Sequence, residues 1–339
     1  MSNAASLHND SLVIDSHNDS AVALIRRGNV GLGGERQPER QERAGAVAYL
    51  RQYHDRDVRM QLDLPTMRAG GIDAAFFAVD TTRAWGNHLL YALDAHGYLK
   101  REIAEHPDDI LIALTTSDID TAKRDGRLAA VLAVENSIAL ERSLYALEAL
   151  YELGVRTLTI THSARNEAAD GCEVAGGGGL TGFGRQVVAR MNELGMLVDV
   201  SHLNDQSFWD VLDASTKPVI ASHSCCRSLC DNPRNLTDEQ LKALGAAAGV
   251  VAITYVPFFV DTSAPSIDRL IDHILHAIDL AGGTAVGLGS DFDGGGDLLE
   301  DASHVPRITD GLLRRGVAEE TVKAVLGGNT YRLLQATID

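Results

Sequence analysis

Histidines and carboxylates recur in this 339-residue chain at the ends of short apolar runs. The first run continues into His17 and Asp19, which lie two positions apart and would share one face of an extended strand. The other residues of this kind are Glu135, His162, His202, His223, Asp291 and Asp293. One such residue alone is usually a hydrogen-bonded structural group. Their recurrence at so many run ends predicts a metal site instead, because imidazole and carboxylate together suit zinc or another first-row divalent ion.

Eight apolar, β-branched runs are the candidate strands that would position these residues. They are nearly continuous rather than alternating, which is typical of strands buried on both faces of a parallel sheet. The runs are 11–17, 72–80, 127–136, 155–163, 194–202, 217–224, 249–256 and 285–293.

Amphipathic helical patterns separate several of these runs, at 141–154, 180–195, 237–249 and 266–282. Thr237 and Gln240 form a capping-box pattern, and Gly154, Gly195 and Gly282 stand where helices should end. Eight strand–helix units predict an α/β fold, a (β/α)₈ TIM-type barrel. The alternative, a doubly wound open sheet, is disfavoured because no GxGxxG follows the first strand.

In such a barrel the C-terminal ends of the strands meet at one mouth, so the ligand-type residues should meet there too. Glu135 ends an apolar run, and a buried carboxylate needs a strong partner. Three histidines and two carboxylates exceed the usual set for one catalytic zinc, which favours two ions about 3.5–4 Å apart with Glu135 as the bridge. Asp291 is then the expected proton carrier between the attacking water and the leaving group.

Composition indicates a soluble globular protein without a disorder signature. The formal net charge of −17 argues against nucleic acid or an anionic membrane as partner. We expect one catalytic barrel over residues 8–339, with residues 1–7 a disordered N-terminus or a cloning remnant. We also expect polar loops at 28–60 and 165–181 on the mouth face, and a cytoplasmic location.

Three of the four cysteines (Cys172, Cys225, Cys226, Cys230) cluster in SHSCCRSLC. A thiolate metal site would need a second CxxC-type pair, which the chain lacks, so reduced thiols are the expected state.

The blocks around these residues resemble the membrane dipeptidase (renal dipeptidase) family of binuclear zinc peptidases. They occur in the family's order from about residue 11 to 335. The blocks are IDSHNDS, AVEN, THSARN, LVDVSHL, VIASHS, NPRNLTDEQL, GLGSDFDGG and GGNTYRLL.

The resemblance implies a role for each matching residue. His17, Asp19 and Glu135 would bind one zinc, and Glu135, His202 and His223 the second, giving two Zn²⁺ per chain. His162 would contact the substrate and polarise the scissile carbonyl, and Asp291 falls on the family's catalytic aspartate. Arg234 would pair with the substrate's C-terminal carboxylate, for which a planar guanidinium is suited, although a surface salt bridge is its ordinary alternative.

Other positions are less well defined by the resemblance. Tyr255 stands near aromatic pocket residues of the family and is a candidate substrate contact. Asp293 is expected to be a turn or supporting residue rather than a ligand. Asp80 and Arg83 replace a more apolar continuation in the family, and the sequence leaves open which of the two points inward.

The resemblance predicts a zinc-dependent dipeptidase that uses a metal-bridging hydroxide and also accepts L-Xaa–D-Xaa dipeptides. One alternative is a binuclear amidohydrolase acting on a cyclic amide, a lactone or an N-acyl amino acid. Many such barrels bridge their metals with a carbamylated lysine, which the end of the fourth strand lacks. The other is a catalytically silent metal-binding barrel. The expected partner is a small dipeptide, and the family also leaves a homodimer open.

Overall fold

The computed structural model describes residues 3–26, 30–34, 60–83 and 86–339. Nine strands occur in this part of the chain, and all their pairings are parallel. They are β1 (Ile14–Asn18), β2 (Ala74–Asp80), β3 (Ile110–Ile112), β4 (Leu128–Glu135), β5 (Val155–Thr159), β6 (Leu197–Asp199), β7 (Ile220–Ser224), β8 (Val250–Ile253) and β9 (Val286–Leu288).

Eight of these strands close into a ring. The order runs β1–β2–β4–β5–β6–β7–β8–β9, and β9 returns to β1 through the pair Asp15 and Leu288. The short β3 adds to the start of β4, where Ile110 pairs with Leu128, and lies outside the ring. The predicted (β/α)₈ barrel is therefore confirmed, with β3 as an unpredicted addition.

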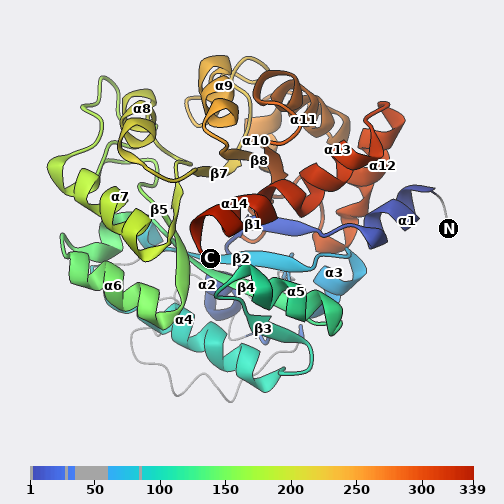
Figure 1. The fold of residues 1–339 in the computed structure, drawn as a ribbon, viewed down its shortest axis with the longest axis horizontal. Helices are drawn as coiled ribbons and strands as arrows, with labels where there is room; N and C mark the ends of the chain where they lie inside the picture. Colours follow the sequence, from blue (N-terminus) through green and yellow to red (C-terminus); the bar gives the residue numbers. More distant parts are fainter. Residues whose placement is uncertain (1–2, 27–29, 35–59, 84–85) are drawn as a thin grey trace.

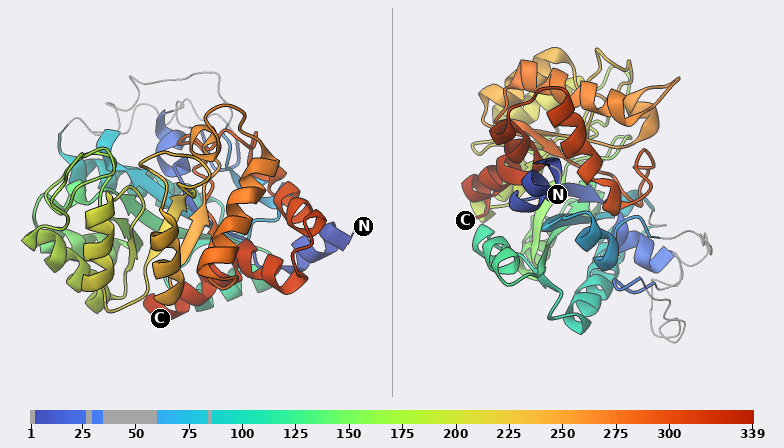
Figure 2. Two further views of the ribbon diagram at one scale, coloured as in Figure 1. Left: turned by 90° about the horizontal axis from the view of Figure 1, so that it is seen from above. Right: turned by 90° about the vertical axis from the view of Figure 1, so that its right-hand side faces the viewer.

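Most of the helices surround the ring on its outside, and α14 crosses one end of the ring (Figure 1); the side views also show helices around the strands (Figure 2). The α-helices are α1 (Asn3–Asp10), α2 (Ser20–Arg26), α3 (Leu64–Ala69), α4 (His88–Glu105), α5 (Thr116–Arg124), α6 (Leu144–Leu153), α7 (Gly182–Leu194), α8 (Asp205–Ala214), α9 (Asp238–Ala246), α10 (Pro257–Val260), α11 (Ile267–Ala281), α12 (Pro306–Arg314), α13 (Glu319–Lys323) and α14 (Asn329–Thr337). Short 3₁₀ turns are η3 (Thr81–Arg83), η4 (Ser137–Leu140) and η5 (Ala302–His304), and η6 (Ala324–Gly328) is a π-helix. No helix of the described residues is both long and apolar enough to cross a membrane.

The four predicted helices correspond to α6, α7, α9 and α11. Thr237 and Gln240 form the predicted capping box at the start of α9. Gly154 and Gly195 end α6 and α7 with φ of 114° and 75°, a conformation that side chains with a Cβ rarely adopt. These local signals fix where each helix stops before its chain turns into the next strand.

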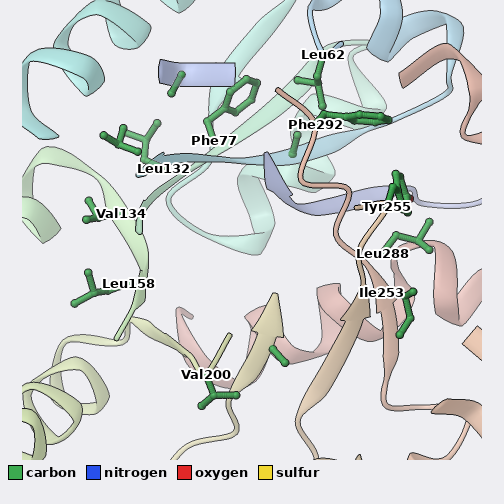
Figure 3. Packing of buried hydrophobic residues seen from close by; sticks show 14 of the residues in the cluster. Leu62, Phe77, Leu132, Val134, Leu158, Val200, Ile253, Tyr255, Leu288 and Phe292 are labelled. Atoms are coloured by element: carbon green, nitrogen blue, oxygen red, sulfur yellow. The ribbon is translucent and has the colours of Figure 1, made fainter. Parts of the chain in front are cut away.

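Both faces of the strands are buried, as the continuous apolar runs predicted. Ala75, Phe77 and Val79 of β2 belong to the outer cluster, which packs against the surrounding helices. The alternate Ala74 and Phe76 belong to an inner cluster that also includes Leu333 and Leu334 of α14. Figure 3 shows outer-cluster side chains on several strands around the ring. This double burial is what makes the strand ends rigid supports for a site.

The N-terminus and the loops differ in part from expectation. Residues 3–7, expected to be disordered, form the first half of α1, where Leu7 is buried. The predicted loop 28–60 lies largely outside the described residues. The loop 165–181 is held by Asp170, whose carboxylate accepts from Arg165 and from the backbone N–H of Gly178. This ion pair inside the loop is one reason for its defined position.

His273, on α11, gives the barrel wall a predicted dependence on pH. Its Nδ1 accepts the backbone N–H of Cys226 at 3.0 Å, so its Nε2–H donates to the Val260 carbonyl at 2.8 Å. Burial lowers the pKa of His273 from 6.5 to about 4, and the charge of Arg269 acts in the same direction. The pKa of His273 is lower in the native state than in the unfolded state. The stability that neutral His273 contributes is therefore fully present above pH 6.5 and is lost as the pH falls towards 4.

We expect native protein to lose about 2 kcal/mol more unfolding free energy than His273→Gln between pH 7 and pH 5. The variant should be less stable than native at pH 7. Because glutamine does not titrate, its unfolding free energy should change less with pH. Urea unfolding followed by circular dichroism at both pH values measures the difference. Parallel curves for the two proteins would contradict the prediction.

Candidate active site

The predicted ligands lie at the C-terminal ends of the strands. Glu135 is the last residue of β4, and His223 is inside β7. His17 lies in β1, and His202 follows β6 by three residues in a backbone with φ of 68°. All four are at least nine-tenths buried. The strand ends therefore bring together residues that lie more than two hundred positions apart in the chain.

Glu135, His202 and His223 form the first group. The Nε2 atoms of His202 and His223 are 2.9 Å apart. Both nitrogens also face Oε1 of Glu135, at 2.9 Å and 3.4 Å respectively. Three potential ligand atoms thus point at one small volume.

His17, Asp19 and Asp291 form a second group, on the other side of Glu135. The ligand atoms of these three residues lie within 4.8 Å of one another. Nε2 of His17 is 3.9 Å from Oε2 of Glu135, the oxygen that does not face His202. The two oxygens of one carboxylate therefore face two different groups, as a bridging ligand requires.

The backbone holds the second group through pairing between the ends of β1 and β9. The Asp291 N–H donates to the His17 carbonyl at 3.0 Å, and the Asp19 N–H donates to the Phe292 carbonyl at 2.9 Å. A Cβ on Gly294 would lie 2.2 Å from an Asp19 carboxylate oxygen and 2.3 Å from one of Asp291. Only glycine lets the chain pass this close to the two carboxylates.

Burial also sets the protonation of the site. It lowers the pKa of His17, His202 and His223 well below the ordinary histidine value. Burial likewise raises the pKa of Glu135, to which the negative charge of Asp80 contributes, while the charge of His17 opposes the shift. Neutral imidazoles offer the lone pairs that metal binding needs.

These residues fit a divalent metal centre. Nε2 of His17, which faces the second group, is buried without a hydrogen-bond partner among the described residues. A buried carboxylate surrounded by neutral imidazoles is costly unless a cation neutralises it. The donor set of imidazole nitrogens and carboxylate oxygens is the set that zinc accepts. Metal binding would satisfy groups that the protein leaves unsatisfied.

His162 and Asp80 flank the centre. His162 follows β5, and its ring stacks on that of His202 with centroids 4.1 Å apart. Asp80 pairs in register with Glu135 on the neighbouring strand, and a carboxylate oxygen of Asp80 lies within 4.8 Å of ligand atoms of Glu135 and His162. Of the two residues whose direction was open, Asp80 therefore points inward. The side chain of Arg83 lies outside the described residues.

Arg234 lies beside the first group with 5% of its surface exposed. Its Nη1 donates to Oγ of Ser224 at 2.9 Å, and its Nη2 donates to the His223 carbonyl at 2.7 Å. Its Nε has no partner among the described residues, and its guanidinium lies 5.6 Å from the centre of the Phe259 ring. The residue is thus a fixed cation inside the site, and the surface salt-bridge alternative is wrong.

A cavity of about 380 Å³ opens onto these groups. Among its lining residues are Asp19, Glu135, His162, His202, Arg234 and Asp291. The lining also includes residues that sequence reasoning missed, namely Ser163, Cys172, Glu173, Asn232, Phe258 and Phe259. Four of them lie on loops after strands, and Phe258 and Phe259 lie on the four-residue helix α10, so no periodic pattern marks these residues as facing inward.

Tyr255 does not line this cavity. It is 1% exposed, and its ring packs edge-on against Phe292 with centroids 5.5 Å apart (Figure 3). The structure therefore gives no support to Tyr255 as a substrate contact, and Phe258 and Phe259 are the aromatic residues at the cavity. The reason is strand alternation, since Val251, Ile253 and Tyr255 all belong to the outer cluster.

Asp293 has the supporting role that was expected. Its carboxylate accepts from Oγ of Ser20 at 2.6 Å and from the backbone N–H of Gln61 at 2.9 Å. It therefore ties the loop after β9 to the segment that leads into α3.

The four cysteines are free thiols. The thiols of Cys225, Cys226 and Cys230 each donate to a different backbone carbonyl. Burial raises the pKa of Cys225 to about 12. These contacts do not support a thiolate metal site.

The fold and the site together define a (β/α)₈ barrel with clustered histidines and carboxylates at its mouth that could hold divalent metal. A family model for membrane dipeptidases (Peptidase family M19) matches residues 1–339. The chain belongs to this family, which confirms the resemblance found in the sequence.

Individual relatives agree with this assignment. The chain is 37% identical over 239 residues to dipeptidase verJ of Clonostachys rogersoniana, which is 69% of this chain but only 62% of that protein. An amidohydrolase from Pseudomonas aeruginosa has a similar structure, with 26% identity, a TM-score of 0.79 and 98% of each chain covered. So does a metallo peptidase from Rhodobacter sphaeroides liganded with a phosphinate mimic of L-Ala-D-Ala, with 26% identity, a TM-score of 0.82 and coverage of 97% of this chain and 100% of that one.

Proposed function

We propose that this protein is a zinc-dependent dipeptidase that binds two ions per chain and cleaves the peptide bond of dipeptides, including L-Xaa–D-Xaa. The observation that carries the proposal is the position of Glu135, whose two oxygens face two separate groups of ligand atoms. The family assignment and the dipeptide mimic bound by the Rhodobacter sphaeroides relative support it. The cytoplasmic location and the homodimer stay predictions of the sequence.

His17, Asp19 and Glu135 would hold one ion, and Glu135, His202 and His223 the other. A divalent ion held by these residues would supply Lewis-acid polarisation of the scissile carbonyl and would lower the pKa of a bound water. The group of Glu135, His202 and His223 and the proximity of His17 to the other oxygen of Glu135 support this division of the ligands.

Arg234 and the size of the cavity define the substrate. The buried guanidinium, with an unpartnered Nε–H, would bind the carboxylate of the second residue. The cavity volume of about 380 Å³ lies at the lower end of the range for small-ligand sites, which favours a dipeptide over a longer chain. Because the anchor recognises the carboxylate rather than the side chain, a D-residue at this position is accommodated.

Asp291 and His162 would handle the proton and the carbonyl. Both line the cavity. The Asp291 carboxylate accepts the proton of the attacking water and then gives it to the leaving nitrogen, as a general base followed by a general acid. His162, on the opposite wall, donates to the oxygen of the scissile carbonyl as negative charge develops there.

The proposal is tested with purified protein loaded with zinc and a panel of L-Xaa–L-Xaa and L-Xaa–D-Xaa dipeptides. We expect two zinc ions per chain and turnover of both classes. N-acyl amino acids and cyclic amides are assayed as alternative substrates, because they share the amide but lack the free amine of a dipeptide. Turnover of these compounds, with none of any dipeptide, would replace the proposal with an amidohydrolase.

Arg234→Lys is expected to raise KM for dipeptides by about 10–100-fold, with a smaller change in kcat. Lysine keeps the charge but loses the fixed planar donors that match a carboxylate. Dipeptide amides, which have no C-terminal carboxylate, provide the control. The native enzyme should bind them poorly, and the substitution should change their kinetics little. An equal loss for acids and amides would show that Arg234 does not read the carboxylate.

A further inference from the structure

Asp199, the last residue of β6, is fully buried and accepts four hydrogen bonds. Its Oδ1 accepts from the backbone N–H groups of Ser201 and Ser222, both at 3.0 Å. Its Oδ2 accepts from the hydroxyls of Thr159 and Ser222, both at 2.6 Å. Four donors fill the lone pairs of a carboxylate. Asp199 is therefore not a metal ligand itself, although His17 and His223 lie close by.

Asp199 controls the direction of a chain of hydrogen bonds. Because a carboxylate can only accept, the hydroxyl hydrogen of Ser222 points at Asp199. The lone pairs of the same hydroxyl then face Nδ1 of His223, which is 2.8 Å away. Nδ1 must carry the hydrogen in this contact, which leaves the lone pair of His223 on Nε2, the nitrogen that faces Glu135 and His202.

We propose that Asp199, acting through Ser222, is a positioning residue that holds His223 in the one tautomer able to bind metal through Nε2. This inference rests on the metal role of His223 in the proposed function. Ligating histidines generally donate their second ring N–H to a fixed acceptor, and loss of that partner weakens metal binding. Here the acceptor is a hydroxyl whose own direction is fixed by a carboxylate one step further away.

Asp199→Asn should reverse this chain of hydrogen bonds rather than break it. The two backbone N–H groups at Oδ1 cannot turn around, so the amide oxygen must take that position. The amide NH₂ then occupies the place of Oδ2 and donates to Ser222. The Ser222 hydroxyl is then free to donate to Nδ1 of His223, which at 2.8 Å is nearer than its other neighbour, Oγ of Ser201 at 3.4 Å. This donation moves the ring hydrogen to Nε2 and blocks the metal position.

The experiment compares zinc affinity in Asp199→Asn, Ser222→Ala and the double variant, by competition with a chromophoric chelator. We expect Asp199→Asn to weaken one of the two zinc sites by about 10–100-fold. Ser222→Ala should lose less, because His223 is then free to adopt either tautomer. The double variant should match Ser222→Ala, since reversal needs the hydroxyl. The second substitution thus restores affinity that the first removes.

Thr159→Val is the matched control. It removes the other hydroxyl at Oδ2 of Asp199 with little change in volume and does not touch His223, so we expect zinc affinity within twofold of native. Circular dichroism confirms that each variant is folded. Native-like zinc affinity in Asp199→Asn, an equal loss in Thr159→Val, or a double variant weaker than Asp199→Asn would each overturn the inference. If the native protein binds no zinc, the proposed function fails instead.

Discussion

Glu135→Gln is expected to lose at least one of the two metal ions and to lower dipeptide hydrolysis by about 10³-fold or more. Glu135 is 2% exposed, and its two oxygens face two separate ligand groups. A glutamine has one acceptor oxygen, and its NH₂ would face one of these groups. In that group the glutamine NH₂, a hydrogen-bond donor, replaces a carboxylate oxygen whose lone pair would bind the metal, so the group cannot complete a metal site.

The same substitution should leave the metal-free protein at least as stable as native. A buried carboxylate among neutral imidazoles has a large desolvation cost, and a neutral amide of the same shape avoids most of it. Zinc content, hydrolysis and the urea midpoint after removal of the metal together check the prediction. Glu102→Gln is the control, because Glu102 is also buried but accepts from Leu32 N–H, away from the site. Two zinc ions retained in Glu135→Gln would contradict the bridging role.

Asp291→Asn is expected to lower kcat by about 10²–10⁴-fold while both ions remain bound and KM changes little. The backbone at this position has φ of 61°, a conformation that asparagine tolerates better than most residues. The backbone carbonyl of Asp291 still accepts from the N–H groups of Gly294, Gly295 and Gly296. The change therefore keeps these backbone contacts and removes the carboxylate that would carry the proton.

Asp293→Asn is the matched control for Asp291→Asn, because it changes a nearby aspartate that supports the loop and is not expected to carry a proton. Asp293 has nearly the same backbone conformation, with φ of 65°, but its carboxylate bonds Ser20 and Gln61 instead of facing the cavity. We expect Asp293→Asn to lower stability while the folded fraction keeps its kcat. Steady-state kinetics, zinc content and thermal midpoints of the two variants distinguish the cases. Loss of zinc in Asp291→Asn would make that residue a ligand rather than a proton carrier.

The barrel and its polar centre were predictable because they depend on simple geometry. Continuous apolar runs indicate parallel strands, and parallel strands in a barrel place their C-terminal residues at one mouth. Glu135 was the clearest case, since a carboxylate at the end of a fully apolar strand is costly to bury unless a cation or a strong donor faces it. His17 and Asp19 were joined by strand alternation alone. The other ligand-type residues could be grouped with them once a closed barrel was predicted, because a barrel places all its strand ends at one mouth.

Other features depended on information that the predicted pattern did not include. Helix α4 was not predicted, although its buried residues Tyr91, Ala95, Leu99 and Ile103 recur every four positions. Strand β3 is only three residues long, too short for a periodic signal. Tyr255 was expected at the pocket from its family position, whereas strand alternation places it with Ile253 on the outer face. The contact between Asp199 and Ser222 joins two strands and has no local signature.

The ring closes between its first and last strands, and this has a consequence for biosynthesis. Asp15 pairs with Leu288, and Oγ of Ser16 donates to the carbonyls of Ser222 and Leu288. A chain still emerging from the ribosome can fold its earlier helices and strands, but β1 cannot meet β9 before residue 288 has been made. His17 and Asp19 then join Asp291 only in the final stage of folding. The second ligand group is therefore completed late, after the residues of the first group have already been made, and a chain that ends before β9 lacks Asp291 altogether.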